Sequence, residues 1–133
     1  MAIEEAKYLS YVEAVYLHII LMRSWNEPLY GVADKTLIES ALARPRQAVT
    51  YENADLIRQA ATLYFGLIKN HPWFGGNKRT TTAVVDEFLY RNGKEITASK
   101  ADVIELVLNI ESDQYGVDEI EHWLQQRVTN LSQ

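Results

Sequence analysis

The sequence has 133 residues, of which 47% are hydrophobic and 23% charged, with a net charge of −5 and no cysteine. This length and composition are typical of one globular domain, which we expect to span residues 1–133. The absence of cysteine excludes disulfides and thiolate metal sites, and the negative charge argues against broad nucleic-acid binding. No apolar run reaches the roughly 18 residues of a membrane helix, and residues 1–7 lack the cationic start of a secretory signal. We therefore expect a cytoplasmic protein that binds neither a membrane nor nucleic acid directly.

Two helices are expected in the N-terminal third of the chain. The first covers residues 3–23, and a loop marked by proline and glycine follows at residues 25–31. His18 has no acidic or histidine partner three or four residues away, so we expect it to be structural or exposed. Asp34 is a suitable N-cap for a second helix that runs to about Ala43. The buried face of the first helix is predicted to comprise Leu9, Val12, Tyr16, Ile19 and Ile20.

Pro45 is expected to end this second helix, because proline in a helix interior removes a hydrogen bond and clashes with the preceding turn. Residues 44–52 are therefore predicted to form an irregular or short extended connection. Arg46 in this connection could reach a phosphate, but a solvated side chain is the simpler expectation.

Two strongly helical segments flank a short central loop. Residues 53–70 place apolar side chains three and four apart, and Pro72 restricts His71 to non-helical conformations, so this helix should end at His71. The next helix should begin near Asn77 and end at Arg91–Asn92, before Gly93. The expected core residues are Leu56, Ala60, Leu63, Tyr64 and Leu67 in the first segment and Val84, Val85, Phe88 and Leu89 in the second.

The loop between these helices contains residues suited to general-base catalysis. His71 stands at a helix end, where we expect packed neighbours to hold its imidazole. Histidine titrates near neutral pH, and a general base works only when its position is fixed. Trp73 is more plausible as an apolar plug that fixes the loop than as a reactive group. His71 is therefore the candidate catalytic base.

The same loop predicts an anion site at the start of the helix that follows. Free N–H groups and the positive end of the helix dipole favour an anion there, and glycines allow close approach of a phosphate. Lysine and arginine in a first helical turn conflict with that dipole unless an anion is bound. The candidate phosphate-binding residues are Gly75, Gly76, Asn77, Lys78 and Arg79.

The C-terminal third should contain a brief extended link and two more helices. The link covers residues 94–97, and Ser99 with Asp102 resembles a capping pattern at the start of the next helix. Tyr115–Gly116 should separate this helix from the last one, over residues 117–128, and residues 129–133 should fray. The predicted core residues are Val103, Leu106, Val107, Ile110, Ile120, Trp123 and Leu124, with His122 exposed.

The stretch His71-Pro72-Trp73-Phe74-Gly75-Gly76-Asn77-Lys78-Arg79-Thr80 resembles the signature of the Fic/Doc superfamily. Its Asn-Lys-Arg ending looks like the death-on-curing (Doc) toxin branch, because the Fic branch has glycine where Lys78 stands. Residues 31–34, 37–45 and 65–70 are also similar to the Doc branch, so the resemblance covers roughly residues 29–97.

The resemblance implies an all-α fold, a compact helical bundle of about six helices with a short flap-like loop that in relatives lies near residues 44–52 over the active site. It also implies binding of ATP and Mg²⁺, with His71 deprotonating a target hydroxyl and Asn77, Lys78 and Arg79 holding phosphate. Doc-type relatives are kinases of elongation factor Tu, Fic-type relatives transfer AMP, and the usual partner is a small antitoxin. Lysine at position 78 is associated with a reversed nucleotide, so that the γ-phosphate is transferred.

One residue departs from the family pattern. Gly75 stands where relatives carry the magnesium-binding acid, and phosphoryl transfer depends strongly on neutralising phosphate charge. Asp86 is about 13 Å further along the helix and is no obvious substitute. Three interpretations therefore remain open at this point: an active toxin-like kinase, an AMP transferase, which Lys78 disfavours, and a module that binds nucleotide or antitoxin with little transfer.

Overall fold

The computed structural model describes residues 5–131 and confirms the all-α prediction. Within these residues the chain forms six helices and a two-stranded antiparallel sheet. No helix among them has the length and apolar character needed to cross a bilayer. The elements are α1 (Tyr11–Ser24), α2 (Lys35–Glu52), α3 (Leu56–Asn70), α4 (Asn77–Arg91), β1 (Lys94–Ile96), α5 (Lys100–Glu111), α6 (Val117–Gln125) and β2 (Val128–Asn130).

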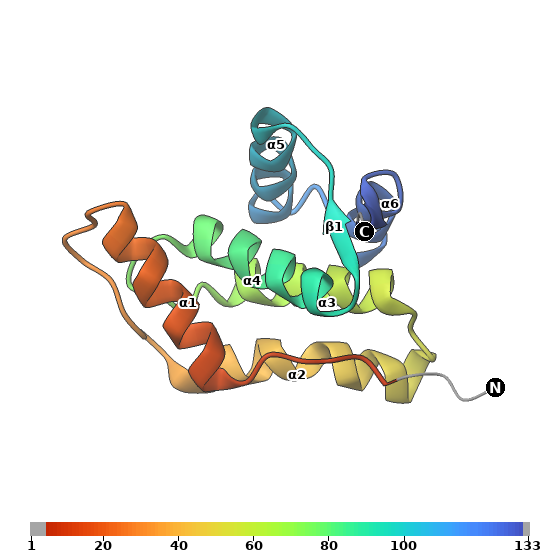
Figure 1. The fold of residues 1–133 in the computed structure, drawn as a ribbon, viewed down its shortest axis with the longest axis horizontal. Coiled ribbons are helices and arrows are strands. Elements are labelled where there is room, and N and C mark those ends of the chain that lie inside the picture. The colour runs from red at the N-terminus through yellow and green to blue at the C-terminus, as the bar shows by residue number, and fades with distance from the viewer. Residues whose placement is uncertain (1–4, 132–133) are drawn as a thin grey trace.

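Helix α3 is the centre of the fold. It packs against α2, α4, α5 and α6, and Figure 1 shows it behind α4 with α2 below and the C-terminal helices above. An α-helix that is buried on several faces needs small or apolar side chains all round. Nine of its fifteen residues are buried, including Ala60, Ala61, Leu63, Tyr64 and Leu67. The site therefore begins at the C-terminal end of the most buried helix of the described chain.

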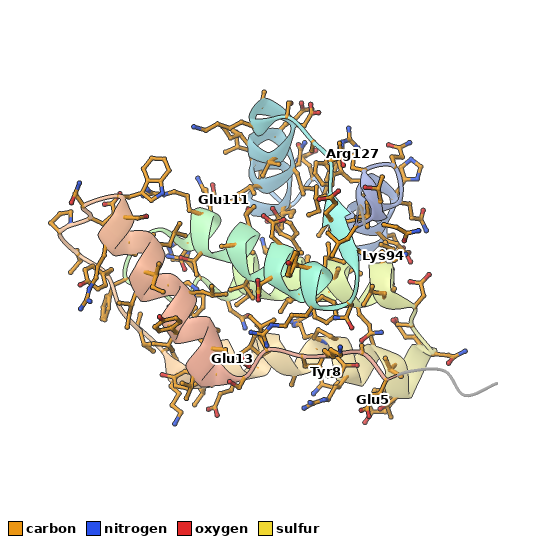
Figure 2. All side chains as sticks on the ribbon, in the orientation of Figure 1. Glu5, Tyr8, Glu13, Lys94, Glu111 and Arg127 are labelled. Carbon is orange, nitrogen blue, oxygen red and sulfur yellow. The ribbon has the colours of Figure 1, made fainter. Side chains whose placement is uncertain are left out.

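The expected start and buried face of α1 are wrong. The helix begins at Tyr11, where Ser10 and Glu13 form a capping box, and residues 5–10 run as an extended segment across α2 (Figures 1 and 2). Residues 3 and 4 of the predicted helix lie outside the described residues. Apolar residues occur on every side of this helix, so periodicity cannot select the buried side. Of the predicted face, Leu9 is buried as expected, although it lies in the extended segment before the helix, whereas Val12 (72%), Tyr16 (64%) and Ile20 (45%) are exposed. The buried residues of α1 are Ala14, His18 and Met22.

The predicted end of the second helix at Pro45 is also wrong. Asp34 caps α2 as expected, but the helix continues through a buried Pro45 to Glu52, so residues 44–52 are not a connection. Proline in a helix interior costs about 3 kcal/mol. Packing of α2 along α3 offsets this cost, and a Cβ at Gly66 of α3 would lie 2.6 Å from Arg44 Cδ. The close approach of α2 to α3 at Gly66 arises from tertiary packing, so helix propensities along residues 44–52 cannot predict it.

The C-terminal prediction is partly confirmed. Ser99 caps α5, α6 starts at Val117, and the predicted core residues Ile120, Trp123 and Leu124 are buried with His122 exposed. The last helix stops at Gln125, however, and Val128–Asn130 forms β2 instead of continuing the helix or fraying. It pairs with β1 in the register Ile96–Val128, which was not apparent because the two strands are only three residues long and lie far apart in sequence. Residues 132 and 133 lie outside the described residues.

His18 links three parts of the fold around the start of α4. Its imidazole is fully buried and stacks on Trp73, with ring centroids 4.3 Å apart and an interplanar angle of 16°. Its Nε2 accepts a hydrogen bond from the Gly31 N–H at 3.0 Å, so Nδ1 carries the proton and donates to Thr80 Oγ1 at 2.8 Å. The expectation that His18 is structural is confirmed.

We predict that protonation of His18 makes the fold acid-sensitive. Burial lowers the pKa of His18 from 6.5 to about 4, so between these values the unfolded chain binds more protons than the folded chain. The stabilisation linked to neutral His18 should therefore be fully present above about pH 6.5. The free energy of unfolding should fall by up to about 3 kcal/mol as the pH drops from 6.5 to about 4. Denaturant unfolding at several pH values measures this loss.

The control is His18→Gln, which should be less stable at neutral pH and should have a shallower dependence of stability on pH between 6.5 and 4. An identical slope in both proteins would show that other groups cause the acid sensitivity.

Candidate functional site

The loop that follows α3 is fixed by its main chain. His71 is the C-cap of α3, and the predicted helix end at this residue is confirmed. Its backbone is left-handed (φ 48°, ψ 54°), which is a common way to end a helix but differs from the extended conformation that a following proline favours. Residues 72–74 then lie against residues 31–34, with an isolated β-bridge between Val32 and Trp73. The supporting hydrogen bonds are Ala33 N–H (2.9 Å) and Asp34 N–H (3.2 Å) to Pro72 O, and Phe74 N–H to Gly31 O (2.9 Å).

The side chain of Asn77 stabilises this loop through two hydrogen bonds to the Trp73 backbone. Its Oδ1 accepts the Trp73 N–H at 3.0 Å, and its Nδ2 donates to Trp73 O at 2.9 Å. Trp73 is 2% exposed, in keeping with its predicted role as a plug. The Asn77 amide thus holds the loop rather than capping α4, whose N-cap is Gly76.

His71 is placed by its backbone and not by packing around its ring. The residue is exposed, and its imidazole makes no hydrogen bond to the part of the chain that the structure describes. The expectation that packed neighbours hold this imidazole is therefore wrong. Because His71 is exposed, its ring is accessible to a second molecule from solvent.

The start of α4 presents uncapped N–H groups. Gly76 has φ 61°, and a Cβ at this position would collide with the side chain of Met22. No side chain within the described residues caps the first N–H groups of α4. Such groups carry the positive end of the helix dipole and are suited to an anion. The left-handed conformation expected of the glycine pair belongs to Gly76 alone.

Lys78 and Arg79 each face a carboxylate at the start of α4. Lys78 Nζ lies 3.2 Å from Glu111 Oε1, and Figure 2 shows Glu111 where the end of α5 approaches α4. The Arg79 guanidinium lies 2.5 Å from Glu27 Oε1 and 4.7 Å from the centre of the Trp25 ring. These carboxylates offset two cations that the helix dipole disfavours. All four side chains are partly exposed, so an anionic ligand could exchange with either carboxylate.

The geometry at Gly75 does not suit a magnesium ligand. A Cβ here would lie 2.8 Å from the carbonyl oxygen of Leu29, so the loop 25–31 occupies the space of any side chain. The Asn77 amide is already engaged, and no cluster of three potential metal ligands occurs among residues 5–131. The residues of this site therefore do not fit a side-chain-held Mg²⁺.

Beside this site, a groove of about 380 Å³ separates α4 from α5. Its walls are mainly apolar side chains, and Lys78 and Arg79 lie at its edge. Asp86 also lines it, and desolvation raises the pKa of this carboxyl to about 6. Sequence analysis placed Asp86 too far along α4 for metal binding and did not identify the groove, because α5 and Trp25 reach it only through tertiary packing.

Trp25, Glu27 and Leu29 are the site residues that sequence analysis missed. All three come from a loop recognised only by its proline and glycine, and no residue spacing links them to the start of α4. His18 could have been recognised as buried only from its spacing, because Ala14, His18 and Met22 are four residues apart and lie on one face of α1.

Two sequence comparisons bear on the family of this chain. Toxin Doc of Mycolicibacterium smegmatis (strain ATCC 700084 / mc(2)155) is 39% identical over 69 residues, which are 50% of this chain and 53% of that protein. The chain thus spans about half the length of this relative, and the predicted similarity to the Doc branch is confirmed. A family model described as the Fic/DOC family matches residues 8–89, which include the loop, the start of α4 and His18. Because this match covers more than half of the sequence, the chain belongs to the Fic/DOC family.

Proposed function

We propose that the protein is the toxin of a toxin–antitoxin pair and transfers the γ-phosphoryl group of ATP to a serine or threonine hydroxyl. The proposed target is elongation factor Tu, and the proposed partner is a small antitoxin, both in the cytoplasm. The observation that carries the proposal is the placement of an accessible His71 at one end of a fixed loop and of the uncapped start of α4, with Lys78 and Arg79, at the other. The similarity to Toxin Doc of Mycolicibacterium smegmatis supports the biological setting of the proposal.

In this proposal one side chain accepts a proton, and a separate group of residues stabilises the charge of the phosphates. His71 accepts the proton of the target hydroxyl while its oxygen forms a bond to the γ-phosphorus. The bond from that phosphorus to the bridging oxygen breaks, and ADP leaves. The N–H groups at the start of α4, together with Lys78 and Arg79, stabilise the phosphate charge after exchange with Glu111 and Glu27. Gly76 permits the close approach, and Trp73 and Asn77 keep the loop in place.

We assign magnesium no protein side chain and no step in this mechanism. Ions that accompany ATP would have phosphate oxygens and water as ligands, an arrangement that magnesium commonly adopts. Charge neutralisation therefore depends more on Lys78 and Arg79 than in a site with an acidic metal ligand.

A second candidate function is a nucleotide- or antitoxin-binding module with little transfer. The observation that favours it is that residue 75 is a glycine and carries no acid, and that a Cβ at this position would lie only 2.8 Å from the Leu29 carbonyl oxygen. AMP transfer is the remaining enzymatic alternative, and Lys78 argues against it through the resemblance.

We predict that His71→Ala lowers the rate of γ-phosphoryl transfer to elongation factor Tu by about 10²- to 10⁴-fold, with little change in ATP affinity. The His71 ring is exposed and makes no hydrogen bond within residues 5–131, so its loss should affect the chemistry much more than the fold. The measurement uses ATP labelled at the γ- or the α-phosphate, with ATP binding followed separately by calorimetry. Label transferred from the α-position would indicate AMP transfer, and ATP binding without any transfer would favour the binding module. An equal loss of binding and rate would assign His71 a structural role.

We predict that Gly75→Ala lowers the free energy of unfolding by about 1 kcal/mol, because the new Cβ would press on the Leu29 carbonyl. Thermal unfolding measures this effect. Gly116→Ala is the matched control, since it also adds a Cβ before a helix, but beyond its chain neighbours the nearest atom to that Cβ is Glu119 Oε1 at 3.8 Å. An equal effect in both variants would contradict the contact with Leu29.

We also predict that Gly75→Asp increases magnesium-dependent transfer relative to Gly75→Ala once the loop 25–31 has shifted to admit the side chain, a shift that both variants require. Both variants carry the same Cβ, so their difference isolates a carboxylate, which is a preferred ligand of magnesium. Equal transfer rates over a magnesium titration would mean that the lost acid does not limit activity in this chain.

A further inference from the structure

His18 is a buried titratable residue that the proposed reaction does not use. Its side chain belongs to α1 and is fully buried, and its hydrogen-bond partners lie in the loop 25–31 and in α4. Burial lowers the pKa of His18 to about 4, so the ring is neutral at pH 7 and accepts one hydrogen bond while it donates another. The ring is therefore suited to holding elements together rather than to carrying protons.

The hydrogen bond from the Gly31 N–H to His18 Nε2, at 3.0 Å, is the first of a series that reaches the loop after α3. Gly31 O accepts the Phe74 N–H at 2.9 Å, and Ala33 N–H donates to Pro72 O, also at 2.9 Å. Pro72 directly follows the candidate base. A displacement of Gly31 would therefore be transmitted to the main chain beside that base.

Gly31 depends on these hydrogen bonds for its orientation. Its φ is 123°, a conformation that glycine reaches easily but that its own backbone does not enforce. Apart from its chain neighbours, no atom of residues 5–131 lies within 4 Å of where its Cβ would be, so close packing does not hold it either. The contact with His18 is thus the link between this flexible residue and the rigid core.

We propose that His18 is a positioning residue of the transferase, and that its hydrogen bond to Gly31 holds His71 at a fixed place relative to the start of α4. The kinetic part of this inference rests on the proposed function. Loss of the hydrogen bond should lower kcat, because a misplacement of about 1 Å can cost about a hundredfold in rate. ATP affinity should change little, since N–H groups of α4 itself face the phosphates.

Three substitutions separate the contacts of His18. His18→Gln carries an amide oxygen near the Nε2 position and can still accept the Gly31 N–H, whereas His18→Asn has its amide near Nδ1 and reaches only Thr80. His18→Phe keeps a ring for the stack on Trp73 and loses both hydrogen bonds.

We expect kcat to stay within about threefold of the unsubstituted protein in His18→Gln and to fall by about tenfold or more in His18→Asn and His18→Phe. Affinity for ATP, measured by calorimetry, should stay within about threefold in all three variants.

Ile120→Val and Ile120→Ala are the controls for lost stability. Ile120 is fully buried in α6, and its side chain makes none of the hydrogen bonds of the loop. Both variants should unfold more easily than the unsubstituted protein and keep their kcat. All rates are compared at a temperature where circular dichroism shows every variant to be folded.

Hydrogen exchange of the Phe74 N–H, followed by NMR, gives a second readout that needs no activity. This amide should exchange about tenfold faster or more in His18→Asn than in His18→Gln, because only the glutamine can keep Gly31 in place. The comparison also holds if His18→Phe fails to fold.

Equal kcat and equal Phe74 exchange in His18→Asn and His18→Gln would overturn the positioning role while the proposed transferase stands. A loss of kcat no larger than that of an Ile120 variant of equal stability would overturn it too. No transfer by the unsubstituted protein would overturn the proposed function instead. In that case the exchange of Phe74 alone decides whether His18 positions the loop, and equal exchange in the two variants would show that it does not.

Discussion

The stack of a neutral His18 on Trp73 is the interaction on which the site depends. It joins α1, the 31–34 segment and the first turn of α4 in one buried contact, with hydrogen bonds to Gly31 and Thr80 at the two ring nitrogens. Because an imidazolium cannot accept the Gly31 N–H, the arrangement requires the uncharged ring, which burial favours. The loop that carries the candidate base is thus held by a histidine that is itself unsuited to proton transfer.

Charge at the start of α4 is balanced by residues from outside this helix. Two cations stand where the helix dipole disfavours them, and carboxylates from the loop 25–31 and from α5 offset them. Both ion pairs are partly exposed, so each contributes little to stability. In the proposed mechanism a phosphate takes the place of these carboxylates. The same pairing connects the anion site to the groove, because Lys78 and Arg79 contribute to each.

Gly75 shows how one substitution changes the surroundings of a site. The Leu29 carbonyl lies where a side chain at residue 75 would begin, so loss of the acid and the position of the loop 25–31 are coupled. Restoring an acid at residue 75 therefore requires movement of that loop. Comparing Gly75→Asp with Gly75→Ala separates the effect of the carboxylate on transfer from the steric cost of the added Cβ. Family membership alone does not say whether residue 75 can accommodate an acid, because that depends on the position of the Leu29 carbonyl in this structure.

The sequence by itself determined the helices with clear periodicity, their caps at Asp34 and Ser99, and the loop after His71, because these features follow from local spacing, capping chemistry and proline geometry. It also indicated the family through a contiguous motif. Only the tertiary structure decided that α2 passes through Pro45, which side of α1 is buried, and that Val128–Asn130 pairs with β1. The exposure of His71, the pairing of the two cations and the groove beside Asp86 depend equally on segments distant in sequence. Tertiary contacts of this kind can offset local costs such as the roughly 3 kcal/mol of a proline inside a helix, and they cannot be predicted from the spacing of residues along the chain.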